Sequence, residues 1–165
     1  HPRLKHPSGS TWPGIVSLVT RGTDGEPLAI HRTFLARDGA GKAPVAPQKM
    51  MLGPCRGGAV RLAMPVGKLM VGEGIETCNA AMQATGLPVW AALSTSGLCV
   101  LQLPAEVDEV IVLADGDDPG EAAALDAARR WKREGRTVRI ARPPTGMDFN
   151  DVLLGRVAGA QEGAA

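Results

Sequence analysis

The chain has 165 residues, of which 44% are hydrophobic and 21% are charged, and its net charge is +1. These values are typical of a globular protein and allow one domain, or two small subdomains that share a core. No stretch is apolar enough to span a membrane, no signal peptide is visible, and the three cysteines lack the Cys-x-x-Cys spacing of a zinc site.

The first half of the chain predicts short β-strands. Residues 1–14 are rich in Pro, Gly and Ser, so we expect a loop or an extended segment there. An Asp-Gly pair in the segment RGTDGE predicts a β-hairpin between the first two strands. The expected strands cover residues 15–20, 27–36, 48–52 and 59–63.

The second half of the chain alternates between strand and helix patterns, which predicts a parallel sheet with helices packed on it. Helix formers followed by Gly86 indicate one helix, and a segment with early acidic and late basic residues indicates another. We expect Thr95 and Ser96 to be turn residues. The expected strands are 68–72, 88–93, 109–115 and 137–143, and the expected helices are 74–86 and 119–135.

The two halves also differ in charge. Residues 1–68 carry ten Lys and Arg side chains against three Asp and Glu, whereas residues 69–165 carry eight against fourteen. A basic part joined to an acidic part suits a protein that binds phosphates with one and a metal ion with the other. A chance division of solvated charges is the alternative.

Glu73 follows the apolar strand 68–72 and precedes Gly74. A carboxylate between the end of a strand and the start of a helix can bind a metal ion or accept a proton. Gly74 would let a phosphate or a backbone segment approach closely. The alternative is an ordinary turn or helix-capping acid. Glu76, three residues later, is expected to complement the helix dipole.

Asp115 and Asp117 follow the most apolar strand of the chain. Extended backbone directs residues i and i+2 to the same side, so the two carboxylates could share one cation. Mg²⁺ is the natural candidate because it prefers oxygen ligands and usually also binds phosphate. Asp118 should point elsewhere and is expected to cap the helix that begins near Pro119.

A third acidic segment, GMDFNDVLL, follows the last strand. Asp148 and Asp151 could complete an acidic pocket, with Asn150 as a polar neighbour. The same pattern is also typical of a turn followed by a helix cap. The residues alone leave both interpretations open.

These three segments together resemble the Toprim domain, which bacterial-type primases, topoisomerases and some nucleases share. The resemblance rests on VGEGIETCNAAMQATG, VIVLADGDDPGEAAALDAA and GMDFNDVLL, and it covers residues 66–154. Primases of phages, plasmids and other mobile elements, including primase-helicases, are the most similar. In the first half, LAIHRTFL and APQKMMLGP resemble a hairpin and a Pro-Lys segment of the primase core.

The resemblance implies an α/β fold with a Toprim (Rossmann-like) parallel sheet and flanking helices, preceded by a small β-rich basic subdomain. We expect that subdomain over residues 1–65, the Toprim domain over 66–154 and a flexible tail over 155–165. Because the chain begins at His1, we expect it to be a fragment of a longer protein.

The resemblance also implies roles for individual residues. Asp115, Asp117 and Asp148 would hold Mg²⁺ or Mn²⁺, with Asp151 as a further ligand of the third segment. Glu73 would act as a general base in polymerisation or as a general acid in strand cleavage. The residues expected to contact nucleotide or template are Lys49, Arg32, Lys68 and Gly74.

The leading hypothesis is therefore the catalytic core of a DNA primase, which transfers ribonucleotides on a single-stranded DNA template. Its substrates would be the template and ribonucleoside triphosphates. Zinc-binding and helicase domains or replication proteins would be its neighbours. The odd number of cysteines favours free thiols in a reducing cytoplasm, which for this family would be bacterial.

Four alternatives compete with this hypothesis. A Toprim nuclease would need the same acids, whereas a topoisomerase would need a tyrosine, which this chain lacks. A phosphatase with an Asp-x-Asp motif is disfavoured because Pro119 stands where that motif needs Thr or Val. A non-catalytic nucleic-acid-binding module would bind template without a divalent metal ion.

Overall fold

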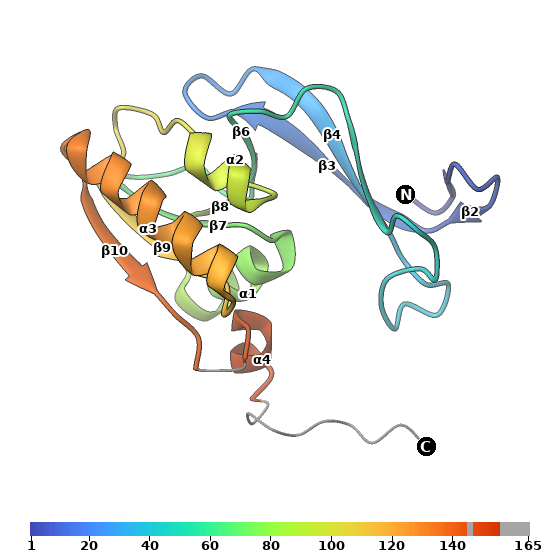
Figure 1. Ribbon diagram of the computed structural model, residues 1–165. Helices are drawn as coiled ribbons and strands as arrows, with labels where there is room; N and C mark the ends of the chain where they lie inside the picture. Colours follow the sequence, from blue (N-terminus) through green and yellow to red (C-terminus); the bar gives the residue numbers. More distant parts are fainter. Residues whose placement is uncertain (145–146, 156–165) are drawn as a thin grey trace.

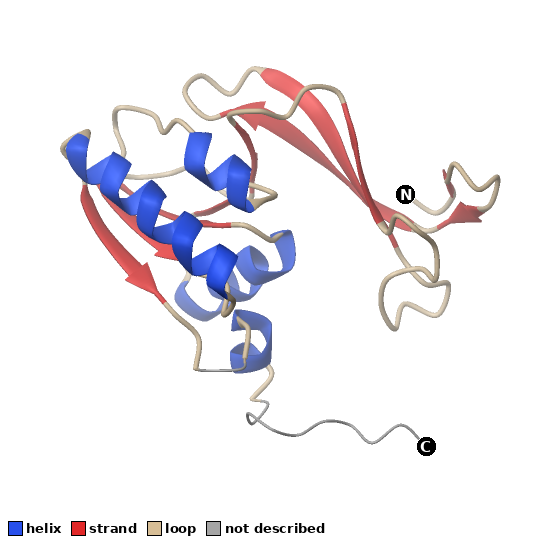
Figure 2. Ribbon diagram, viewed as in Figure 1, coloured by secondary structure: helices blue, strands red, loops and turns tan. Residues whose placement is uncertain are grey.

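The computed structural model describes residues 1–144 and 147–155. Its centre is one eight-stranded sheet in the order β10-β9-β7-β8-β6-β3-β4-β5 (Figures 1 and 2). The expected tail, residues 155–165, lies outside the described residues apart from Gly155. Among the described helices, none has both the length and the apolar character needed to cross a bilayer.

The antiparallel part of the sheet is built by the first half of the chain. The expected hairpin is present, and a register shift interrupts it between Val19 and Thr20. Each strand begins and ends within two residues of its predicted position. The four strands are β3 (Gly14–Arg21), β4 (Pro27–Phe34), β5 (Lys49–Leu52) and β6 (Gly58–Arg61).

The N-terminal segment is more ordered than the sequence predicts. Strands β1 (Leu4–Lys5) and β2 (Thr11–Trp12) pair antiparallel where we expected a loop or an extended segment. The reason is a tertiary contact, because the His6 ring is almost fully buried and packs edge-on against Phe34, with the ring centres 4.9 Å apart. No local sequence pattern reveals that contact.

The second half supplies a parallel sheet flanked by helices, which confirms the expected α/β fold. Strand β8 pairs parallel with β7 and antiparallel with β6, so the parallel and antiparallel parts form one continuous sheet. The strands are β7 (Lys68–Gly72), β8 (Val89–Ala91), β9 (Glu109–Leu113) and β10 (Thr137–Ala141). The helices are α1 (Ile75–Thr85), α2 (Thr95–Val100), α3 (Asp118–Arg133) and α4 (Phe149–Leu153).

Alternate residues of the parallel strands pack into two hydrophobic clusters, one on each face of the sheet. Leu69 and Val71 of β7 belong to the cluster that α2 and α3 cover, where Trp131 is completely buried. Met70 faces the other way, into the cluster beneath α1 with Ile75. The sheet is thus a middle layer, with α3 and α1 on opposite faces.

Two local predictions were wrong. Residues 94–97 do not form an isolated turn, because Ser94 accepts a hydrogen bond from the Gly97 N–H and so caps α2. Asp118 does not cap α3. That role belongs to Asp117, which accepts from the Gly120 N–H, and Asp118 is the first helical residue. The chain bends at residues 116 and 117, but Asp117 keeps an extended backbone, with φ −113° and ψ 161°, so the cap lies one residue earlier than we predicted.

The parallel topology brings three segments to one edge of the sheet. Strands β7, β8 and β9 run in the same direction, so the residues that follow them meet at their carboxyl ends. Glu73 follows β7, the α2 cap follows β8 and Asp115 follows β9. This edge is where the candidate site lies.

Candidate functional site

Glu73 is the most perturbed acid at this edge. Burial raises the pKa of its carboxyl to about 7, and the nearby charges of Asp115 and Asp117 add to the rise. Its Oε1 atom is buried and has no hydrogen-bond partner among the described residues. A half-buried carboxyl with one unsatisfied oxygen is suited to take part in proton transfer or to bind a cation.

Asp115 lies in the same electrostatic environment. Burial raises its pKa first, and the negative charges of Asp117 and Asp148 raise it further, while Lys49 acts in the opposite direction. Carboxyls from three separate segments therefore influence one another across the sheet edge. Such mutual repulsion is relieved by a proton or by a cation.

Gly120 allows the Asp115–Asp117 segment to pack closely against α3. A Cβ atom at Gly120 would lie 2.9 Å from Asp117 Oδ1 and 3.0 Å from the Asp115 Cβ. Any larger side chain would push both acids away from the helix. The Gly120 N–H also donates to Asp117 Oδ1 at 2.8 Å, which fixes the orientation of that carboxylate.

Asp148 and Asp151 form a reciprocal cap on α4. Asp148 Oδ1 accepts from the Asp151 N–H at 2.7 Å, and Asp151 Oδ2 accepts from the Asp148 N–H at 3.1 Å. The turn-and-cap interpretation therefore describes their local structure. Asp148 nevertheless remains close enough to raise the pKa of Asp115. It therefore caps α4 and also belongs to the acidic edge.

Residues 1–144 and 147–155 contain no group of three or more His, Cys, Asp or Glu side chains placed to hold a metal ion. The donor chemistry still fits a hard divalent cation, because the edge offers carboxylate oxygens and one of them is buried without a partner.

A lysine from the antiparallel part of the sheet faces this acidic edge. Lys49 of β5 binds Glu76 of α1, with Nζ and Oε2 3.0 Å apart, and Lys42 binds the same carboxylate at 3.5 Å. Glu76 therefore does more than complement the helix dipole. It joins the two parts of the sheet and holds Lys49 where its charge acts on Asp115.

The charges of this ion pair act on His31 of β4. It is buried, and its Nδ1 has no hydrogen-bond partner among the described residues. Burial lowers the pKa of its ring, and the charge of Lys49 lowers it further. Both effects favour the neutral imidazole, and the charge of Glu76 opposes them.

Two of the predicted contact residues lie elsewhere. Arg32 of β4 pairs with Met50, the neighbour of Lys49, so its side chain projects from the opposite face of the sheet. Lys68 begins β7 at the far edge, where its Nζ lies 3.0 Å from Glu109. Gly74 caps α1 with an extended backbone and no side-chain hydrogen bond, directly beside Glu73.

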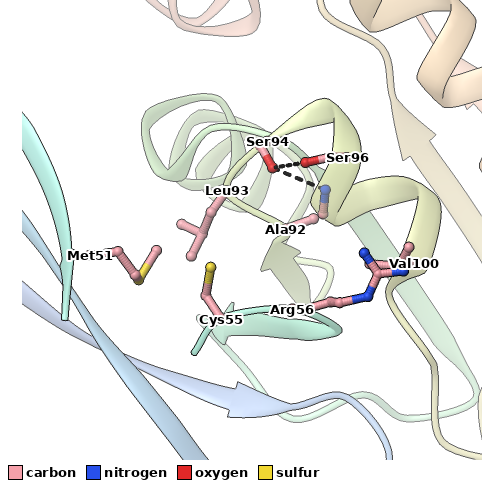
Figure 3. Close-up of a pocket in the computed structure, with 9 residues that line it drawn as sticks. Met51, Cys55, Arg56, Ala92, Leu93, Ser94, Ser96 and Val100 are labelled. Atoms are coloured by element: carbon pink, nitrogen blue, oxygen red, sulfur yellow. Dashed lines mark hydrogen bonds between the residues drawn. The ribbon is translucent and has the colours of Figure 1, made fainter. Parts of the chain in front are cut away.

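A pocket of about 330 Å³ next to this edge has no counterpart in the sequence analysis (Figure 3). It lies between the loop that follows β5 and the start of α2. Its residues come from two segments of the chain, 51–56 and 92–100, and among them only Met51 belongs to a segment, APQKMMLGP, that carries the family resemblance. The side chains that define it are Met51, Cys55, Arg56, Leu93, Ser96 and Val100.

Each half of the chain matches a family model. The Toprim domain family matches residues 68–159, and a domain of unknown function, DUF7146, matches residues 1–62. Comparison with curated proteins gives no significant match.

Several solved primase structures resemble the chain. A DNA primase domain from Pseudomonas aeruginosa is 18% identical, with a TM-score of 0.56 over 93% of this chain and 52% of that one. The zinc-binding and RNA polymerase domains of the Aquifex aeolicus primase are 17% identical, with a TM-score of 0.60 over 93% and 40%. The RNA polymerase domain of Mycobacterium tuberculosis primase DnaG is 18% identical, with a TM-score of 0.55 over 93% and 55%. The chain thus has the fold of these domains and spans about half their length or less.

Proposed function

The chain belongs to the Toprim domain family, and on that premise we propose that it forms the catalytic core of a DNA primase. Its reaction would be ribonucleotidyl transfer on a single-stranded DNA template. The fold that it shares with primase domains over 93% of its length supports this proposal. A nuclease built on the same acids is the second candidate.

The observation that carries the proposal is the meeting of opposite charges across the sheet edge. Acids from three segments of the Toprim part interact with one another, and Lys49 from the antiparallel part faces them. A nucleoside triphosphate needs this combination. Its phosphates bind a cation that acids hold, and a lysine balances the remaining negative charge.

Glu73 would accept the proton in this reaction. A carboxyl with a pKa of about 7 is half ionised at neutral pH, so it can act as a general base there. The 3′-hydroxyl of one nucleotide attacks the α-phosphorus of the next. The new O3′–P bond forms, the bond to the β-phosphate bridging oxygen breaks, and pyrophosphate leaves. The hydroxyl proton passes to the Glu73 carboxylate.

Asp115 and Asp117 would hold the divalent cation, together with Asp148 and, as a further ligand, Asp151. Bound Mg²⁺ or Mn²⁺ would stabilise the negative charge that develops on the phosphate oxygens. Lys49 would orient the triphosphate, and Glu76 would keep Lys49 in place. Gly74 would leave room for the backbone to approach a phosphate.

The test is a single denaturing gel. The chain is incubated with single-stranded DNA, labelled ribonucleotides and Mg²⁺ or Mn²⁺, and Glu73→Gln serves as the matched variant. We expect labelled oligonucleotides that are absent from the Glu73→Gln reaction. Shortening of the template without new products would favour the nuclease. If the gel shows neither new products nor a shortened template, catalysis by this chain alone is contradicted.

The wider context is part of the proposal. The Aquifex aeolicus structure contains a zinc-binding domain beside its polymerase domain, and this chain covers 40% of that structure. We therefore expect a zinc-binding domain and a helicase or other replication protein as neighbours. An origin in a phage or plasmid and a place in the bacterial cytoplasm remain predictions.

A further inference from the structure

The pocket of about 330 Å³ is bounded by both parts of the molecule (Figure 3). Met51 of β5, followed by Cys55 and Arg56 in the next loop, forms one wall. Leu93 and the first residues of α2 form the other. The volume is at the lower end of the range for small-molecule sites, roughly 300–1,000 Å³, and it suits one nucleoside better than a length of duplex.

One end of the pocket adjoins the acidic edge. Leu93 lines the pocket, and its N–H donates to the carbonyl oxygen of Glu73 at 2.8 Å. Leu93 has a φ of 72°, a conformation that non-glycine residues rarely adopt. Strain of this kind persists only where the surrounding structure enforces it, and it is common at functional sites.

The other end is marked by Arg56. This exposed side chain has no hydrogen bond or ion pair with any residue that the structure describes. Arg56 and Val100 also line a second pocket of about 500 Å³, which continues away from the acids to Arg21 and Gln102. An unpaired guanidinium between two cavities is suited to bind a phosphate group.

Between these ends the lining is apolar, with hydroxyls at its border. Met51, Leu93 and Val100 offer a flexible apolar surface for a flat ring. The Ser94 hydroxyl lies 3.1 Å from that of Ser96 at the border of the pocket (Figure 3). The pocket thus has the Arg56 guanidinium at one end, apolar side chains along its wall, and the backbone contact with Glu73 at the other end.

We propose that this pocket binds the nucleotide whose 3′-hydroxyl attacks, with its 5′-phosphate on Arg56 and its base against Met51, Leu93 and Val100. This orientation directs the 3′ end of the sugar toward Glu73. The orientation rests on the proposed primase function, because only a polymerising enzyme needs a bound attacking nucleotide. Binding of a nucleoside 5′-phosphate in the pocket can be measured without catalysis.

The experiment is equilibrium dialysis of the 165-residue chain with labelled AMP in a buffer that contains EDTA, with adenosine as the ligand that lacks the phosphate. We expect AMP to bind more tightly than adenosine, and Arg56→Ala to weaken AMP binding about tenfold while leaving adenosine binding unchanged. Arg133→Ala, which removes another exposed arginine in the last turn of α3, should bind AMP like the wild type.

Three outcomes would overturn the inference: no AMP binding by the wild type, equal AMP affinity in the wild type and Arg56→Ala, or displacement of AMP by an equal concentration of inorganic phosphate. The primer-synthesis gel separates this failure from failure of the proposed function. If AMP binding depends on Arg56 but no primers form, the function and the orientation fail while the nucleotide site stands. If primers form and Arg56→Ala binds AMP normally, only the pocket inference fails.

Discussion

At the scale of single residues, the acids at the sheet edge lower the stability of the fold while they suit the site for proton transfer or cation binding. Glu73 keeps a buried oxygen that no described residue bonds, and its charge is repelled by Asp115 and Asp117. Ionising such a group requires more free energy in the folded state than in the unfolded chain, where water solvates the carboxylate. A site that is selected only for folding would replace this carboxylate with an uncharged side chain.

A pH-dependent effect on stability follows from Glu73. Its folded-state pKa of about 7 lies above the ordinary glutamate value of 4.5, so the folded state binds more protons between these two pH values. Stability therefore falls as pH rises through this window. We expect Glu73→Gln to be more stable than the wild type by roughly 1–2 kcal/mol at pH 8, after allowance for solvent screening, and nearly equal at pH 4.

Urea unfolding at the two pH values measures this difference. Glu106→Gln is a suitable control because Glu106 is exposed and precedes β9, whereas the acidic edge follows the carboxyl end of that strand. Equal stabilisation by Glu73→Gln at both pH values would show that the effect comes from packing and not from ionisation.

At the scale of elements, helix caps and site acids are the same residues. Asp117 caps α3, and Asp148 and Asp151 cap α4, while Asp117 and Asp148 also act electrostatically on Asp115. The positive end of a helix dipole favours a carboxylate at this position. Each cap thereby fixes the backbone from which its side chain reaches the edge of the sheet.

Two substitutions of Asp117 separate these roles. Asn caps helices about as well as Asp, so Asp117→Asn should keep the thermal midpoint of the wild type and lose primer synthesis. Asp117→Ala should lose primer synthesis and also about 1 kcal/mol of unfolding free energy. Thermal melting followed by circular dichroism, together with the gel assay, tests both. Wild-type activity in Asp117→Asn would remove Asp117 from the site.

At the scale of the whole molecule, the continuous sheet couples the basic and acidic parts. Strands β6 and β8 pair, and the guanidinium of Arg61 in β6 lies 4.3 Å from the centre of the Trp90 ring in β8. Arg61 also donates to the Gly22 carbonyl at 3.0 Å, which ties the turn of the hairpin to this junction. The position of Lys49 opposite the acids depends on this connection.

Unfolding should therefore be one cooperative transition. Arg61→Ala removes a cation–π contact and hydrogen bonds to backbone carbonyls, so we expect a loss of about 1–2 kcal/mol with the transition still single. Urea curves from tryptophan fluorescence and circular dichroism should coincide. Arg129→Ala, which removes an exposed ion pair on α3, should change stability by less than about 0.5 kcal/mol. Two separate transitions in the wild type would mean that the parts fold independently.

The elements and the order of the acidic segments could be predicted from local patterns. The apolar strands, the helix that ends at Gly86 and the helix that begins near Pro119 are each indicated by neighbouring residues alone. The structure confirms these elements. Parallel strands place the residues after β7 and β9 at one edge, so the proximity of Glu73 and Asp115 follows from the predicted sheet. The acids that follow these strands could therefore be chosen as candidate site residues from the sequence alone.

Only the tertiary structure decided which basic residues face those acids. Lys49, Arg32 and Lys68 were all expected to contact nucleotide or template, but strand pairing places Lys49 and Arg32 on opposite faces, and Lys68 lies at the far edge. The ion pair of Lys49 with Glu76 and the pocket beside Leu93 likewise depend on segments far apart in the chain. Local sequence specifies whether a segment is a helix or a strand and where it ends. Strand order and register specify which side chains lie opposite it, and they depend on many contacts between distant segments.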